Sequence, residues 1–356
     1  MGRSAFFWTV IVALVGVGLN LRACEQCKCQ GLNPVESISL NFDEAFWLGK
    51  HPASSTPASS APDTPGKPAV PDEHVESAPA YMKWSLDTLF EFIKYETPNV
   101  ALYHAILALG RDTHGHEREF DVSERIGYNI TRDLQFSVVQ GYRYLQQREI
   151  DDAAILGKQE HSNGPGDLDF GIQYRFLHQK ECGSPVDLQV FALLKAPTGI
   201  TNNHRPNAAL FETEDQPGTG SFDETIGLSA SKRWGEWGAS AAYGFTHKGE
   251  GSQLFKEGDV NRLSFTGTRK MTPDDWSWKL FLSQGVQWFI ENKAVDHGIT
   301  SPDHGGDFVY AVPGVTVLPN NHLVLTASGT VPIIQQENGF HQKDRFGIQL
   351  NVGVRF

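Results

Sequence analysis

Charged residues recur at alternate positions of segments whose other positions are apolar. If such a segment is a β-strand, its successive side chains point to opposite faces, so the charges share one face. The residues predicted on that face are Arg125, Arg143, Arg175, Lys195, Lys279, Arg345, Asp121, Asp167, Asp169, Asp187 and Glu291. Opposed charges in a confined pore orient polar solutes and set ion preference. The alternative is that they brace a wall or are simply solvated.

A second candidate for chemistry is His161-Ser162-Asn163-Gly164. It is similar to the His-x-Ser-Asn-Gly motif of outer-membrane phospholipases, in which an imidazole takes the proton of a hydroxyl on the same strand face. Here the two residues are adjacent, in a segment expected to be a loop, so that geometry is lost. A hydrolase is the least favoured function, and we predict no catalytic residue.

Metal ligation has weak support. Histidine is a common ligand, but the pair His114 and His116, and His304 beside Asp303, fall in polar loops where exposed histidines are usual. Three thiols are clustered, at Cys24, Cys27 and Cys29, and Cys182 lies far away. A disulfide or simple oxidation is favoured over a soft metal. We predict no metal and no cofactor.

The N-terminus predicts export. Arg3 precedes an apolar run over residues 5–19, and Ala23 precedes Cys24, which is typical of a signal peptide over residues 1–23. Leu21 to Cys24 also resembles a lipobox, in which Cys24 would be lipidated, although Arg22 fits it poorly.

Three short segments follow. Residues 24–49 contain the clustered cysteines, and residues 50–80 are rich in Pro, Ala and Ser, which predicts a disordered linker. In residues 81–98, Leu86, Leu89, Phe90 and Ile93 fit a helical face and predict a helical or plug segment. A strand is the alternative for this segment.

From residue 99 to 356 the hydrophobic period is two. In the last segment, Ile348, Leu350 and Val352 alternate with Gln349 and Asn351. We predict about twelve strands, near 99–110, 117–131, 134–148, 167–178, 186–198, 223–234, 237–248, 259–272, 276–293, 306–319, 322–334 and 343–356. Short turns alternate with longer polar loops, a pattern typical of an all-β, up-and-down transmembrane barrel rather than a soluble β-sandwich.

Aromatic residues and prolines mark the ends of the predicted strands. Trp234, Trp237, Trp276 and Trp278 flank short turns, where an interfacial girdle is expected. The terminal Phe356 resembles the signal that the bacterial barrel-assembly machinery recognises. Pro197 and Pro332 predict bulges or strand ends near the rim, because proline cannot donate to a ladder.

The formal net charge of the 356-residue chain is −12, which argues against a nucleic-acid partner. Aromatic residues make up 11% of the sequence and exclude disorder over most of it.

Several segments, spread over residues 120–356, resemble the outer-membrane family named for the MetA-pathway of phenol degradation. They are Gly166-Asp167-Leu168, Lys195-Ala196-Pro197-Thr198-Gly199, Thr219-Gly220-Ser221-Phe222-Asp223, Ser231-Lys232-Arg233-Trp234-Gly235, Pro313-Gly314-Val315, Val331-Pro332 with Gln335 and Gly339, and the terminal strand. Their order is more specific than any one of them. The resemblance implies an outer-membrane channel of poorly defined substrate.

We therefore expect a bacterial outer-membrane channel or transporter, a porin-like barrel that passes small solutes, including aromatic or hydrophobic compounds. Its expected partners are outer-membrane lipid, the barrel-assembly machinery and the solute. The alternative is a structural protein that anchors a periplasmic partner through residues 24–80.

Overall fold

The computed structural model describes residues 82–96, 108, 115–150, 156–178, 186–302, 304–338 and 343–356. Twelve long antiparallel strands make up most of this part of the chain. They are β1 (Trp84–Tyr95), β2 (Gly115–Asn129), β3 (Leu134–Ile150), β4 (Leu156–Leu177), β5 (Asp187–Ala196), β6 (Asp223–Trp234), β7 (Trp237–His247), β9 (Val260–Lys270), β10 (Lys279–Glu291), β13 (Gly306–Leu318), β14 (Leu323–Glu337) and β15 (Asp344–Arg355). The predicted fold class, an antiparallel barrel of about twelve strands, is confirmed. The twelve include β1, which was not among the predicted strands, whereas the predicted strand near 99–110 lies mostly outside the described residues.

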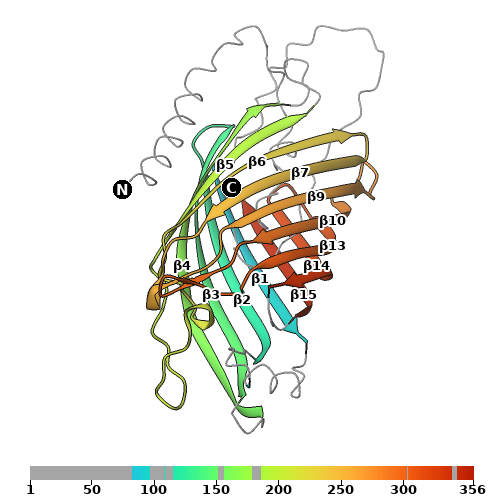
Figure 1. Ribbon diagram of the computed structural model, residues 1–356. Helices are drawn as coiled ribbons and strands as arrows, with labels where there is room; N and C mark the ends of the chain where they lie inside the picture. Colours follow the sequence, from blue (N-terminus) through green and yellow to red (C-terminus); the bar gives the residue numbers. More distant parts are fainter. Residues whose placement is uncertain are drawn as a thin grey trace, which may run out of the picture.

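The strands close into a single barrel (Figure 1). Each strand pairs with the next along the chain, and β1 pairs with β15 to complete the ring. At this seam the amide of Trp84 donates to the carbonyl of Phe356 at 2.8 Å, and the amide of Phe356 donates back at 3.0 Å. Closure leaves the barrel without an unpaired sheet edge.

The helical or plug prediction for residues 81–98 is wrong, because β1 is a barrel strand between β2 and β15. Its buried positions alternate, with Asp87 and Glu91 on the inside, and Trp84 and Phe90 exposed on the outside. Leu86 and Phe90 satisfy both periods, which is why the helical pattern was visible. Leu89 and Ile93, the other two residues of the predicted helical face, lie on the inside with the carboxylates, so the strand divides that face between the two sides of the wall.

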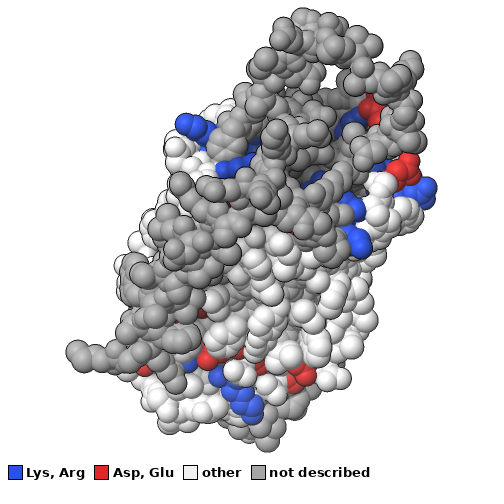
Figure 2. All heavy atoms as spheres, turned by 90° about the horizontal axis from the view of Figure 1, so that it is seen from above, with Lys and Arg blue, Asp and Glu red and all other residues white. Residues whose placement is uncertain are grey.

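The two faces of the barrel differ in chemistry. In β15, Ile348 and Leu350 are exposed on the outside, whereas Gln349 and Asn351 are buried on the inside. On the face that Figure 2 presents, charged side chains gather toward the two ends, and the band between them is free of Lys, Arg, Asp and Glu. An apolar band on the outer surface, around a polar interior, is the pattern of a barrel that crosses a bilayer.

The two ends of the barrel also differ. At the short-turn end, Trp234 and Trp237 face each other across a two-residue turn, and all four predicted girdle tryptophans are exposed. At the long-loop end, the small sheet of β8 (Phe255–Lys256), β11 (Val295–Asp296) and β12 (Ile299–Thr300) joins two loops. Figure 1 shows the yellow and orange loops of this end gathered together at the lower left.

Both proline predictions are confirmed. Pro197 follows the last residue of β5, and Pro332 lies at a register shift between β13 and β14.

β4 is longer than predicted. It begins at Leu156, so most of the loop expected over 149–166 is strand. Predictions for residues 1–80, including Cys24, for Cys182 and for most of 99–110 lie outside the described residues. None of the helices in the described ranges is long and apolar enough to span a membrane.

Candidate functional site

The connection between β5 and β6, residues 197–222, folds into the long-loop end of the barrel; we name it the inserted loop. It contains one turn of 3₁₀-helix, η2 (Thr213–Asp215). Phe211, Asp215 and Gln216 are 1%, 0% and 1% exposed. A loop on a free surface would leave such residues in water, so this one is packed against the barrel.

Arg143 on the inner face of β3 holds the turn of the inserted loop. Its Nη1 donates to the carbonyl oxygens of Glu214 at 2.8 Å and Gln216 at 3.1 Å. Its Nε lies 2.7 Å from Oε1 of Glu119, so the guanidinium is also neutralised by a buried carboxylate. One side chain thus ties the loop to two strands of the wall.

Contacts from opposite sides of the ring reach the same turn. His116 Nε2 on β2 lies 2.9 Å from Oδ1 of Asp215. His304 Nε2, in the loop between β10 and β13, lies 3.0 Å from Oε1 of Glu214. Because β2 and β10 are on opposite sides of the strand order, the inserted loop lies across the mouth of the barrel.

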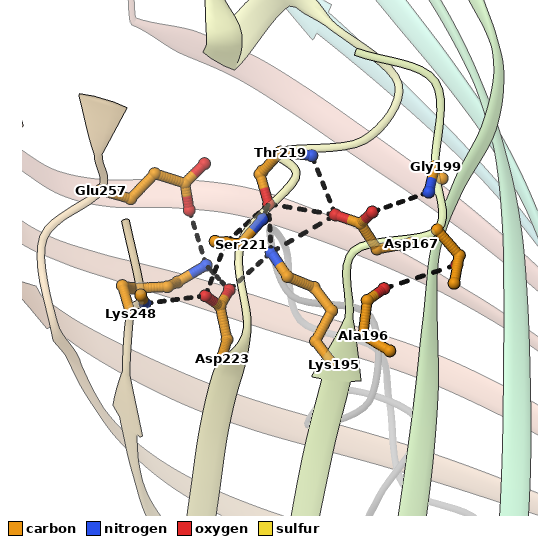
Figure 3. A network of polar contacts seen from close by, with 12 residues as sticks. Asp167, Lys195, Ala196, Gly199, Thr219, Ser221, Asp223, Lys248 and Glu257 are labelled. Carbon is orange, nitrogen blue, oxygen red and sulfur yellow. Dashed lines mark hydrogen bonds and ion pairs between the residues drawn. The ribbon is translucent and has the colours of Figure 1, made fainter. Parts of the chain in front are cut away.

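The two ends of the inserted loop meet in a network of charges that we name the neck network (Figure 3): Asp167, Lys195, Thr219, Ser221, Asp223, Lys248 and Glu257. Strand register builds its centre, because Lys195 of β5 is directly opposite Asp169 of β4 and Asp223 of β6. Lys195 Nζ lies 2.5 Å from Oδ2 of Asp223 and 3.8 Å from Oδ2 of Asp167.

Asp167 closes the neck on the other side. Its Oδ1 accepts the amide of Gly199 at 2.8 Å, and its Oδ2 accepts the amide of Thr219 at 2.9 Å. The backbones are in close contact here, since a Cβ on Gly199 would lie 2.6 Å from the carbonyl carbon of Gly166 and 2.8 Å from Cα of Gly218. Only glycine fits at such an approach.

Lys248 extends the network to the loop after β7. Its Nζ lies 2.6 Å from Oε2 of Glu257 and 3.2 Å from Oδ2 of Asp223. Burial alone would lower the pKa of Lys248, but the carboxylates of Glu257 and Asp223 together raise it above its ordinary value. The ammonium therefore stays charged and joins two acidic groups.

A cavity of about 180 Å³ lies beneath the neck; we name it the balanced cavity. Its charged lining consists of Asp121, Asp167, Asp169, Asp223, Glu257, Arg143, Lys195, Lys248 and Arg262. Five acids thus face four bases, and the distances above show most of them engaged with one another.

The structure brings together five of the eleven predicted charged residues, since Asp121, Arg143, Asp167, Asp169 and Lys195 all line the balanced cavity. Arg125 points inward nearer the short-turn end, where Nη2 lies 3.0 Å from Oδ2 of Asp87. Glu291 lines a second cavity.

Two more predicted residues lie at the short-turn end. Arg175 Nη2 lies 3.7 Å from Oδ1 of Asp133 in the β2–β3 turn, and Asp187 begins β5.

The inward placement of Arg345 is wrong, because its side chain is exposed. The register of β1 with β15 shifts here, so that Lys94 is opposite Phe346 but Tyr95 is opposite Asp344. This bulge turns the carboxylate of Asp344 inward, where it accepts a hydrogen bond from Tyr310 at 2.8 Å.

Alternation did not identify Thr219, Lys248 or Glu257, because they lie in loops. Asp223 carried a usable signal, since it opens a strand beside Lys195 and ends a segment of the family resemblance. Three such segments, around Asp167, Lys195 and Thr219 to Asp223, meet in the neck network although they are far apart in the chain.

The expected loop around His161 and Ser162 is in fact part of β4. Successive strand residues point to opposite faces, and His161 is exposed whereas Ser162 is 2% exposed. The hydroxyl of Ser162 accepts from Nδ2 of Asn203 at 3.0 Å. This arrangement does not pair the imidazole with the hydroxyl. Within the described ranges, no group of three or more His, Cys, Asp or Glu side chains could hold a metal ion.

Comparison with family models gives no match, and comparison with curated proteins gives none. Among solved structures, an outer membrane channel from Pseudomonas putida F1 is similar, with a TM-score of 0.54 and 14% identity, covering 81% of this chain and 100% of that chain. The chain thus shares its β-barrel fold with that channel.

Two other structures are more distant. They are the CymD monoaromatic hydrocarbon channel, with a TM-score of 0.38, 9% identity and coverage of 78% and 89%, and LpxR from Salmonella typhimurium, with a TM-score of 0.38, 9% identity and coverage of 76% and 100%. Both similarities are too weak to support a conclusion.

Proposed function

We propose that this chain is a bacterial outer-membrane channel for passive movement of small solutes, narrowed by its inserted loop. We further propose that it is exported by its N-terminal signal peptide and belongs to the family named for the MetA-pathway of phenol degradation. The meeting of three family-like segments in one network supports that relationship.

One observation carries the proposal of a channel. The interior of the barrel is lined with polar and charged side chains, and a loop tied to opposite walls lies across its mouth. A polar lumen inside an apolar outer band suits water and solutes, and a loop across the mouth sets their size limit. The neck network and Arg143 hold that loop in place.

Conductance of the refolded barrel in planar bilayers tests this function directly, together with swelling of liposomes in a graded series of sugars and amino acids. We expect discrete conductance steps and swelling that falls with solute size. Liposomes without protein are the control. Absence of both steps and swelling, from protein whose barrel is shown to be folded, would contradict the proposal.

We also propose that Phe356 is part of the signal for barrel assembly. It pairs with Trp84 at the seam, and its side chain is exposed. Deletion of Phe356 should lower the amount of folded barrel in the outer membrane, measured by its faster migration in unheated gels. Deletion that leaves that amount unchanged would refute the assignment.

A further inference from the structure

A second cavity, of about 260 Å³, lies at the long-loop end beside the balanced cavity; we name it the acidic cavity. Its walls come from the ends of β10 and β14 and the starts of β9, β13 and β15, together with the inserted loop and the loops after β7 and β10. It lies where solute would first meet the barrel from the long-loop side.

The charged groups that line this cavity are mostly acids: Glu214, Glu257, Glu291, Glu337 and Asp344, against Lys248, Arg262 and His304. Lys248 is engaged by Glu257, and His304 by Glu214. The acidic cavity therefore keeps a negative surplus that its own bases do not cancel, and a cation that enters it would be attracted.

Glu291 is the carboxylate best placed to receive a ligand. It is the last residue of β10, is partly buried and faces the cavity. Among the described residues, no hydrogen-bond donor or base lies within bonding distance of its carboxylate. A partly desolvated carboxylate gains most from an added donor that is itself charged.

Aromatic rings form the apolar part of the same walls. Phe255, Phe289, Phe308 and Tyr310 all line the cavity. Phe289 and Tyr310 pack edge to face with ring centroids 5.8 Å apart, and Arg262 already stands 4.5 Å above the Phe289 ring. The walls thus offer apolar surface for a ring or alkyl chain, and they already accept one cation over a ring.

We propose that the acidic cavity binds small organic cations, in which an ammonium group is attached to an aromatic or apolar body, and selects them for passage. The ammonium would pair with Glu291, and the apolar body would pack on the rings. The inference rests on the proposed channel and names the class of solute that it prefers. The size of the cavity suits a single-ring amine.

Binding of 2-phenylethylammonium to the refolded barrel in detergent, measured by calorimetry, tests the proposal without requiring transport. Phenylacetate and 2-phenylethanol share its ring but replace the cation with an anion or a neutral hydroxyl. We expect the ammonium to bind most tightly. Glu291→Gln should weaken its binding about tenfold by removing a charge-assisted pair. Equal binding of the alcohol, or unchanged binding by Glu291→Gln, would overturn the proposal.

Glu250→Gln is the matched control, because Glu250 is exposed in the loop after β7 and does not line the cavity. If Glu291→Gln does not fold, Glu337→Gln tests the same cavity from β14. If the barrel does not conduct but still binds 2-phenylethylammonium more tightly than the alcohol and the acid, the result would count against the proposed channel function and not against the acidic cavity. Normal conductance without preference for the cation would count against the acidic cavity alone.

Discussion

The balanced cavity and the acidic cavity share Lys248, Glu257, Val260 and Arg262, and they differ in what their other charges do. In the balanced cavity, Asp167, Lys195 and Asp223 bind one another and the two ends of the inserted loop. In the acidic cavity, Glu291 lies open to the space in front of it. The charges of the first group hold the structure together, whereas the carboxylate of Glu291 is available to bind a ligand.

This difference separates two interpretations that the sequence left open for the predicted lumen charges. Arg143, Lys195 and Asp169 belong mainly to the structural interpretation, because they hold or flank the inserted loop. Glu291 fits the other interpretation, in which a lumen charge selects solutes. Substitutions in the first cavity should therefore change the width and stability of the channel, and those in the second should change which solutes pass.

The largest effect is expected for Asp223→Asn. The change removes the carboxylate between Lys195 and Lys248, which leaves two largely buried ammonium groups beside each other. Breaking a buried pair in this way costs about 3–5 kcal/mol. We expect a lower melting temperature and larger, noisier conductance steps. Asp275→Asn, at an exposed site in the β9–β10 turn, is the control.

A somewhat smaller effect is expected for Arg143→Gln. The inserted loop would lose both hydrogen bonds from Nη1 to the carbonyl oxygens of Glu214 and Gln216, and Glu119 would lose the guanidinium 2.7 Å from its Oε1. Hydrogen bonds that involve a charged group contribute about 1.5–3 kcal/mol each. Wider conductance steps with an intact barrel are predicted; steps of the native size would show that Arg143 does not hold the loop.

Gly199→Ala should act by steric crowding alone. Its Cβ would lie 2.6 Å from backbone of Gly166, so the neck must open. Overpacking of this kind costs about 1–3 kcal/mol. Gly267→Ala is a close control, since a Cβ there meets nothing within 4 Å. Thermal melting compares the two variants, and equal melting temperatures would contradict the close packing of the neck.

The smallest effect on stability, and the clearest on selectivity, is expected for Glu291→Gln. No ion pair is lost from the described part of the structure, so the melting temperature should stay near that of the native protein. The preference for cations over anions should fall, because one negative group leaves the mouth. The reversal potential in a salt gradient measures this preference. An unchanged reversal potential would assign Glu291 no part in selection.

Hydrophobic alternation predicted most of the barrel, because one face of each strand is apolar and the other polar. The bounds of β6, residues 223–234, are the same in sequence and structure. Prediction failed where that contrast is lost. Residues 159–166 are polar on both faces and contain Gly164 and Pro165, so the start of β4 resembled a loop.

The candidate site was only partly predictable, for a different physical reason. Alternation identified Lys195 and Asp169, because a strand fixes the direction of each side chain. It could not identify Lys248 or Glu257, whose positions depend on how two loops fold together. Nor could it foresee the bulge that replaces Arg345 with Asp344 on the inner face, since a bulge is set by pairing with another strand.

In the function that we propose, the inserted loop narrows a channel. The most direct test of this narrowing compares the single-channel conductance of the native barrel with that of a loop variant. In the variant, residues 202–215 are replaced by a short Gly-Ser linker, and residues 197–201 and 216–222 at the two ends of the inserted loop are kept. The account predicts small discrete steps for the native protein and much larger ones for the variant. Steps of equal size, or no steps from either folded barrel, would contradict it.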